Sequence, residues 1–180
     1  FLRNLNQNQG AMVQRRRPDY EGTINEYYAS ILLPDSWGLD PTNVRYLEKL
    51  LALAASRGIT VYWLIPPFAP ALQERRVEKG LDAAYTRFVR DFQGKFPNLV
   101  ILDARYSGYV HTVFNDASHL DRQGAITLSN DVAEALGRSA VVDDPACWIE
   151  LPHYRDLSVT AAVEDLGQSE AAVGLMKVRR

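Results

Sequence analysis

The sequence predicts an α/β fold in which amphipathic helices alternate with buried parallel strands. Residues 40–57 and 81–93 each carry apolar side chains at helical spacing, and a glycine follows each segment. Each segment precedes a nearly continuous apolar run, at 59–65 and 99–102, which is typical of strands covered on both faces of a parallel sheet. This alternation of helix and strand is the order expected for right-handed crossover units.

The first helix and strand have clear boundary signals. Asp40 is a favourable N-cap, and Pro41 suits the first helical position. Gly58 is a suitable residue to follow the end of the helix. The apolar stripe between these boundaries comprises Val44, Leu47, Leu50, Leu51 and Ala54. The strand that follows is rich in β-branched and aromatic residues, and two prolines close it.

The second and third helices show the same plan. Gly94 stops the second helix, whose stripe comprises Leu81, Tyr85, Phe88, Val89 and Phe92. Asp121 is expected to cap the third helix, and Gly137 to end it. The apolar positions of this helix are Ala125, Leu128, Val132 and Leu136.

The two ends of the chain lack this pattern. Residues 1–28 predict an irregular arm, and residues 29–33 predict a short strand or a loop segment before Pro34. Beyond the third helix we expect a turn at 143–145, a short edge strand at 147–151 and an Ala-rich helix at 158–176. The predicted organisation is an irregular N-terminal arm at 1–39, an α/β core at 40–138 and a C-terminal extension of unknown role at 139–180.

Composition excludes several functions. The 180 residues are 47% hydrophobic and 23% charged, as in ordinary globular domains, and the net charge of −2 does not favour a nucleic acid or an anionic membrane as partner. Cys147 is the only cysteine, so an intrachain disulfide and a cysteine-based metal site are excluded. No apolar stretch approaches the roughly 18 residues of a membrane span. Neither a dinucleotide-binding nor a P-loop glycine motif occurs, and no cofactor is implied.

The most informative motif is the run from Phe114 to Asp121 (FNDASHLD), which Gly124 and Ala125 follow. It places Asp116 three residues before His119, in a polar turn between a strand and an amphipathic helix. At this spacing a carboxylate can orient an imidazole and stabilise its charged form, as a general base requires when it activates a hydroxyl. Because the turn follows a parallel strand, we expect it at the carboxyl edge of the sheet, where ligands bind.

This motif resembles the Asp-x-x-His block near the C-terminal end of the SGNH (GDSL-type) hydrolases and acyltransferases. The strands at 59–65 and 100–103 resemble the fourth and fifth strands of that family, so the similarity covers about residues 40–137. The resemblance implies a three-layer, flavodoxin-like fold and serine-ester hydrolysis or O-acyl transfer, with acyl ester or carbohydrate substrates. His119 would be the base, and Asp116 its orienting partner. The closest branch includes bacterial cell-envelope enzymes and secreted proteins, which implies a secreted or periplasmic location.

The chain departs from the family at the nucleophile. No Gly-Asp-Ser block and no oxyanion-hole glycine or asparagine block is evident, so we expect a chain without the N-terminal strands of the family and therefore without activity of its own. Ser36, in an Asp-Ser pair after the apolar run 29–33, is a weak candidate nucleophile, because Pro34 stands where the family has glycine. Ser118 adjoins His119, but neighbouring side chains in a turn are expected to diverge.

Two other interpretations are consistent with the sequence. The chain could be a non-catalytic SGNH-like domain for carbohydrate binding or cell-envelope assembly. Alternatively, His111, Asp116 and His119 together could ligate a divalent metal ion, although no fourth ligand is evident. If the N-terminal strands are missing, exposed sheet edges would favour a homo-oligomer.

Overall fold

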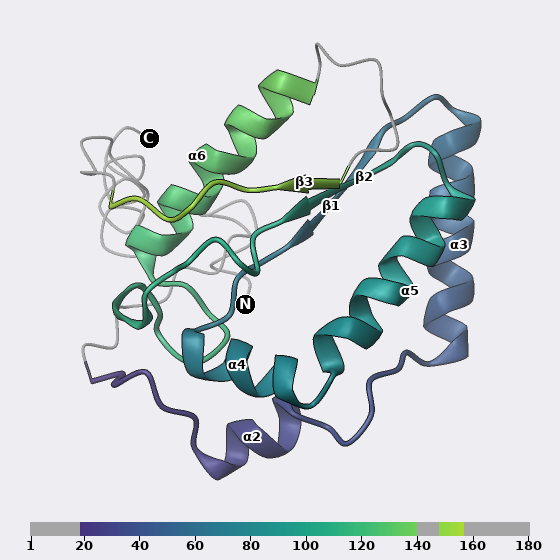
Figure 1. Cartoon of the computed structure of the whole chain (residues 1–180). Coiled ribbons are helices and arrows are strands. Elements are labelled where there is room, and N and C mark those ends of the chain that lie inside the picture. The colour runs from purple at the N-terminus through teal and green to yellow at the C-terminus, as the bar shows by residue number, and fades with distance from the viewer. Residues whose placement is uncertain (1–18, 140–147, 157–180) are drawn as a thin grey trace, which may run out of the picture.

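The computed structural model describes residues 19–139 and 148–156 and has the predicted α/β architecture (Figure 1). Its three strands form one open parallel sheet in the order β1-β2-β3. The strands are β1 (Val61–Ile65), β2 (Leu99–Asp103) and β3 (Trp148–Glu150). The five helices of the described residues are α2 (Glu26–Leu32), α3 (Pro41–Ser56), α4 (Pro70–Glu78), α5 (Leu81–Lys95) and α6 (Arg122–Ser139), and a short 3-10 turn, η1, spans His111–Val113.

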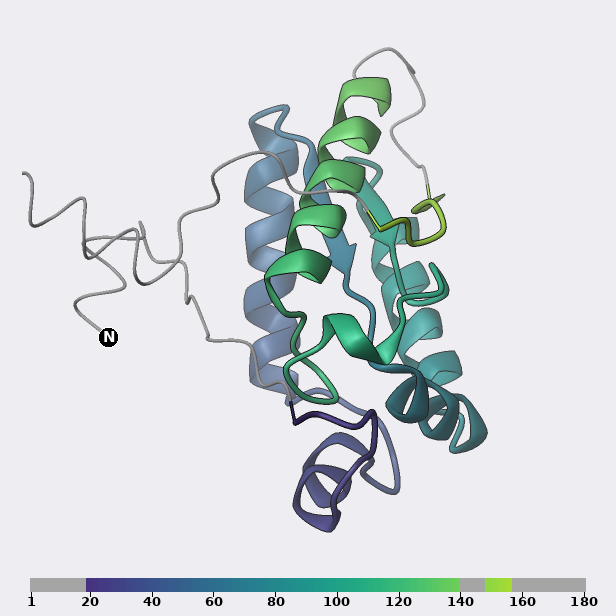
Figure 2. The ribbon, with the colours of Figure 1, turned by 90° about the vertical axis from the view of Figure 1, so that its left-hand side faces the viewer.

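Helices cover both faces of the sheet (Figures 1 and 2). Helices α3 and α5 pack on one face through Leu51, Val89 and Phe92, which meet Ile65 and Ile101 of the strands. Helix α6 packs on the other face against alternate residues of β2, namely Val100 and Leu102. All five residues of β2 are therefore buried, and this strand is the centre of the core.

Several predicted boundaries are confirmed. The Asp40 side chain accepts a hydrogen bond from the Thr42 amide, so Asp40 caps α3 as expected. The edge strand expected at 147–151 is β3, which pairs with β2 in parallel. Two expected helix ends are wrong: α5 continues past Gly94 to Lys95 and α6 past Gly137 to Ser139, so neither glycine ends its helix.

Residues 29–33, expected as a strand or loop, instead belong to helix α2 and its C-terminal end. The Asn25 side chain accepts a hydrogen bond from the Tyr28 amide and starts this helix, which the apolar run alone did not indicate. Helix α4 was also not predicted, because four of its nine residues are charged and no apolar stripe marks it. The turn expected at 143–145, the helix expected at 158–176 and most of the N-terminal arm lie outside the described residues.

Strand β1 differs from its prediction in burial. Its apolar run predicted a strand covered on both faces, but Tyr62 and Leu64 are each 38% exposed. The reason is its position at the end of the described sheet, where β2 is its only neighbouring strand. The α6 face of β1 is thus left partly uncovered by the described residues.

None of the helices in the described part of the chain is long and apolar enough to span a membrane.

Candidate functional site

Asp116 and His119 lie in a tight turn that backbone hydrogen bonds close at both ends. Phe114 and Leu120 form an isolated antiparallel bridge. Inside it, the Asn115 amide donates to the His119 carbonyl at 2.8 Å. The turn therefore has a fixed backbone, although it lies between η1 and α6 and belongs to neither.

The turn lies at the carboxyl end of β1, as expected from the sequence. The Ala69 amide, shortly after the end of that strand, donates to the Ala117 carbonyl at 3.0 Å. On the other side, the Asp121 carboxylate accepts from the Gly124 amide at 2.9 Å and so caps α6. Gly124 is required here, because a Cβ at this position would lie 2.7 Å from the Val113 carbonyl oxygen.

The side chains of the two candidate residues, Asp116 and His119, are in direct contact. Nδ1 of His119 lies 2.9 Å from each carboxylate oxygen of Asp116. The Asp116 side chain is 13% exposed and that of His119 is 59% exposed. Because Nδ1 faces the carboxylate, Nε2 is the nitrogen left to exchange a proton with a substrate or nucleophile.

The surroundings of Asp116 favour its ionised form. Burial raises its pKa, but hydrogen bonds from the Ser118 amide and the His119 ring, with the charge of that ring, lower the pKa by more. The His119 amide also donates to Oδ1, at 3.0 Å. At neutral pH, a carboxylate held in this way supplies the negative charge that stabilises a neighbouring imidazolium.

Ser118 does not diverge from His119, and that expectation is wrong. Its hydroxyl lies 3.2 Å from Nδ1 of His119 and 3.1 Å from Oδ1 of Asp116. The reason is that Asp116 accepts from consecutive backbone amides, which curls the turn so that all three side chains meet. Ser118 approaches the nitrogen that Asp116 already holds, so it cannot be the hydroxyl that Nε2 activates.

The other sequence candidates lie elsewhere. Ser36 is exposed in the loop between α2 and α3, so it follows a helix and not a strand. His111 begins η1, and its side chain lies against the Gly22 backbone. Within residues 19–139 and 148–156, no three His, Cys, Asp or Glu side chains are grouped to hold a metal ion, so the structure does not assemble the metal set of His111, Asp116 and His119.

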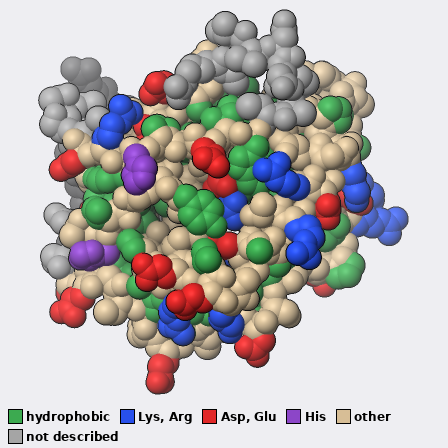
Figure 3. All heavy atoms as spheres, in the orientation of Figure 1, with side chains coloured by type: hydrophobic (Ala, Val, Ile, Leu, Met, Phe, Trp, Pro, Cys, Tyr) green, Lys and Arg blue, Asp and Glu red, His purple; other side chains and the backbone are tan. Residues whose placement is uncertain are grey.

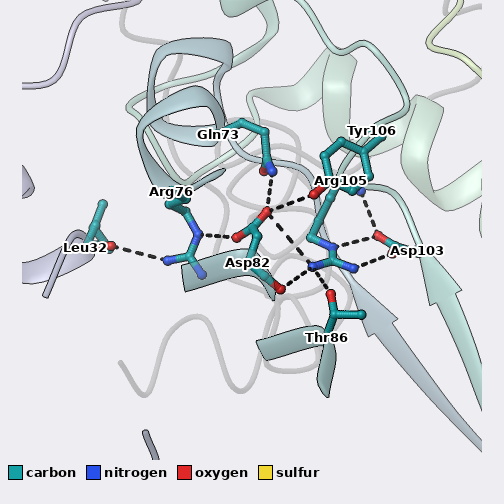
Figure 4. Close-up of polar contacts among 8 residues, drawn as sticks. All are labelled: Leu32, Gln73, Arg76, Asp82, Thr86, Asp103, Arg105 and Tyr106. Carbon is teal, nitrogen blue, oxygen red and sulfur yellow. Dashed lines mark hydrogen bonds and ion pairs between the residues drawn. The ribbon is translucent and has the colours of Figure 1, made fainter. Parts of the chain in front are cut away.

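A second polar cluster was not predicted. It lies at the carboxyl end of β2 and the start of α5 (Figure 4). Asp103 ends the strand and forms a two-point ion pair with Arg105, at 2.6 and 3.0 Å. Arg105 also donates to the Thr86 hydroxyl at 2.9 Å and lies 4.0 Å from the carboxylate of Asp82. The side chains of Asp82, Asp103 and Arg105 are all at most 5% exposed.

Helix α4 completes this cluster. Arg76 donates to Asp82 at 2.9 Å, and the Gln73 amide group donates to the same carboxylate. Burial alone would lower the pKa of Arg105, but hydrogen bonds and the charge of Asp103 raise it, so the guanidinium stays charged. Since α4 begins immediately after Ala69, it connects this buried cluster to the turn of Asp116.

The sequence carried only a weak signal for this cluster. Asp103 and Arg105 stand directly after an apolar strand, a position where charged residues are often functional. Their partner Asp82 is more than 20 residues away in sequence, and no local pattern relates the two segments. No family model, curated protein or solved structure matches the chain.

Proposed function

We propose that this chain supplies the histidine and aspartate of an SGNH-type serine-ester hydrolase or O-acyltransferase. The observation that carries the proposal is the contact between Nδ1 of His119 and the partly buried carboxylate of Asp116, which leaves Nε2 available at the carboxyl end of the sheet. Nε2 accepts the proton of a serine hydroxyl as its oxygen attacks an acyl carbonyl. His119 then returns that proton to the leaving group, and Asp116 stabilises the imidazolium in between.

The uncovered edge of the sheet supports the same fold assignment. In the proposed SGNH-type arrangement, β1 and β2 correspond to the fourth and fifth strands of the family, so earlier strands would pair beside β1. Exposed apolar side chains also occur on β1, just before it and on α3, and additional strands with their helices could cover side chains of this kind. These are Leu50, Leu53, Ile59 and Leu64, with 59%, 51%, 51% and 38% exposure.

The nucleophile is expected from those additional strands. Ser36 lies after helix α2, whereas the family nucleophile follows a strand. Among the described serines, only Ser118 hydrogen-bonds to the His119 ring, and it does so at Nδ1. Because none of the described serines hydrogen-bonds to Nε2 of His119, the structure is also consistent with the alternative function, a non-catalytic SGNH-like domain that binds carbohydrate or serves in cell-envelope assembly.

The test is covalent labelling with a fluorophosphonate, followed by peptide mapping. We expect the 180-residue chain to form no adduct on its own serines. In the longest open reading frame that includes these residues, we expect one reactive serine, and we expect His119→Ala to slow its reaction by about 10³-fold or more. His153→Ala, at an exposed histidine outside the turn, is the control.

Three results separate the outcomes of this experiment. An adduct on Ser36 or another serine of the 180-residue chain would contradict the assignment of the nucleophile. A reaction in the longer polypeptide that His119→Ala leaves unchanged would contradict the role of His119. If no serine reacts in any polypeptide, the non-catalytic alternative replaces the enzymatic one.

A further inference from the structure

A hollow of about 600 Å³ opens beside the buried cluster, between helix α5 and the segment that follows β2. This volume is within the range of small-molecule sites. The polar side chains that line it are Asp82, Thr86, Arg87, Arg90, Asp91 and Tyr106. Neither Asp116 nor His119 is among the lining residues, so this hollow is separate from the site proposed above. Figure 3 shows acidic and basic side chains together on this side of the molecule.

Hydrogen bonds fix the floor of the hollow. Asp82 is held by Gln73 and Arg76, and the Tyr106 hydroxyl lies 3.5 Å from the same carboxylate (Figure 4). The Thr86 oxygen accepts from Arg105, so its own hydrogen remains to be donated to another group. Side chains that are fixed by buried hydrogen bonds need no reorganisation to bind a ligand.

The rim of the hollow carries two arginines, Arg87 and Arg90, that have no polar partner within the described part of the chain. Arg90 instead lies over the Trp148 ring, 4.4 Å from its centre, which leaves the edge of the guanidinium to donate. The negative charge of Asp82 is offset by Arg76 and Arg105. Among the described residues that line the hollow, this leaves Asp91 as the acidic group that opposes the two rim arginines.

The hollow also has an aromatic wall. Tyr106 is 61% exposed, although burial of its hydroxyl and the nearby charge of Asp82 raise its pKa. The ring is therefore held at its polar end and exposed along its body, as in aromatic residues that contact ligands. Guanidinium groups and a hydroxyl donor beside an exposed ring fit a ligand with an acidic group and a flat apolar part.

We propose that this hollow binds a small organic anion. Its carboxylate or phosphate group accepts hydrogen bonds from Arg87, Arg90 and the Thr86 hydroxyl, and its ring lies on Tyr106. The acidic group is placed away from Asp91, whose carboxylate would repel it. No bond is made or broken in this proposal, which concerns binding alone.

The experiment is an NMR titration of the full 180-residue chain with four probes. Benzoate and phenyl phosphate combine an acidic group with a ring, inorganic phosphate has no ring, and benzyl alcohol has no charge. We expect saturable shifts of the α5 and Tyr106 amides with benzoate, phenyl phosphate or both. The member of this pair that binds more tightly identifies the acidic group as carboxylate or phosphate.

Two variants test the residues. Arg87→Ala is expected to lower the affinity for the tighter-binding probe roughly tenfold, which is the usual effect of losing one charge-assisted hydrogen bond. Arg45→Ala, on the exposed side of α3, is the matched control and should leave the affinity unchanged. Tyr106→Phe should retain binding because the ring remains, whereas Tyr106→Ala should weaken it.

Three results would overturn the proposal. The first is the absence of saturable binding by either acidic probe. The second is equal affinity of the wild type and Arg87→Ala for the bound probe. The third is binding of benzyl alcohol as tight as that of the acidic probes, because a neutral ring would then suffice. If inorganic phosphate binds as tightly as phenyl phosphate, the role of Tyr106 is wrong.

Discussion

His119 and Asp116 share two kinds of hydrogen bond: the ring Nδ1 lies 2.9 Å from the carboxylate, and the His119 amide donates to Oδ1 of the same group at 3.0 Å. One carboxylate therefore fixes both the backbone of the turn and the orientation of the imidazole. Asp116→Asn keeps the shape of the side chain and removes its charge. We expect this variant to unfold about 1–2 kcal/mol more easily at neutral pH, which urea denaturation measures.

The same variant has a characteristic pH dependence. Hydrogen bonds from Ser118 and His119 outweigh the effect of burial and lower the pKa of Asp116 in the folded chain relative to the unfolded chain. The carboxylate therefore stabilises the fold above its unfolded pKa, and this contribution is lost as the pH falls through its folded pKa. The urea midpoints of wild type and Asp116→Asn should differ most near neutrality and converge in acid. A constant difference across that range would contradict the ionised state.

Asp82 is expected to be the most sensitive residue of the buried cluster. Asp82→Ala leaves Arg76 and Arg105 buried without this partner, and we expect a loss of about 3–5 kcal/mol in the free energy of unfolding. Asp91→Ala, on the same helix and exposed, should change stability by less than about 0.5 kcal/mol. Equal effects in thermal denaturation would show that the cluster does not hold α4 to α5.

Gly124 and Gly137 allow a matched comparison within α6. A Cβ at Gly124 would meet the Val113 carbonyl, so Gly124→Ala should destabilise the chain by about 1–3 kcal/mol. A Cβ at Gly137 meets nothing within 4 Å, so Gly137→Ala should stabilise the helix by up to about 1 kcal/mol. Chemical denaturation of the two variants should thus give shifts of opposite sign.

The uncovered face of β1 is tested by a pair of leucines that lie side by side in register. Leu102 is buried and Leu64 is 38% exposed. Leu102→Ala should cost about 2–5 kcal/mol, and Leu64→Ala clearly less, because part of its surface is already in water. If Leu64→Ala is as costly as Leu102→Ala, that face is covered in solution by another segment or another chain.

Local signals predicted most of the fold. Caps and stripes located α3, α5 and α6, because a helix that packs on a sheet must repeat its apolar residues. Helix α4 shows no such stripe, since only Leu72 is a fully buried apolar residue in a segment rich in charge. Helix α2 was also missed, because its short apolar run has no period that separates helix from strand.

The sequence likewise predicted one part of the candidate site and missed others. The contact between Asp116 and His119 was predictable, because a spacing of three residues in a turn is a local relation. The approach of Ser118 depends on the curl that Asp116 imposes on the backbone, which residue types alone do not reveal. The pairing of Asp82 with Arg105 joins segments that only the packing of α5 against β2 brings together.

We propose that Asp116 holds His119 with Nε2 free to accept a proton. The most direct measurement is the tautomer of neutral His119, read from the ¹⁵N shifts of its two ring nitrogens by NMR. We expect the proton on Nδ1, donated to Asp116, with Nε2 as the unprotonated nitrogen. A proton on Nε2, or a mixture like that of free imidazole, would contradict the account.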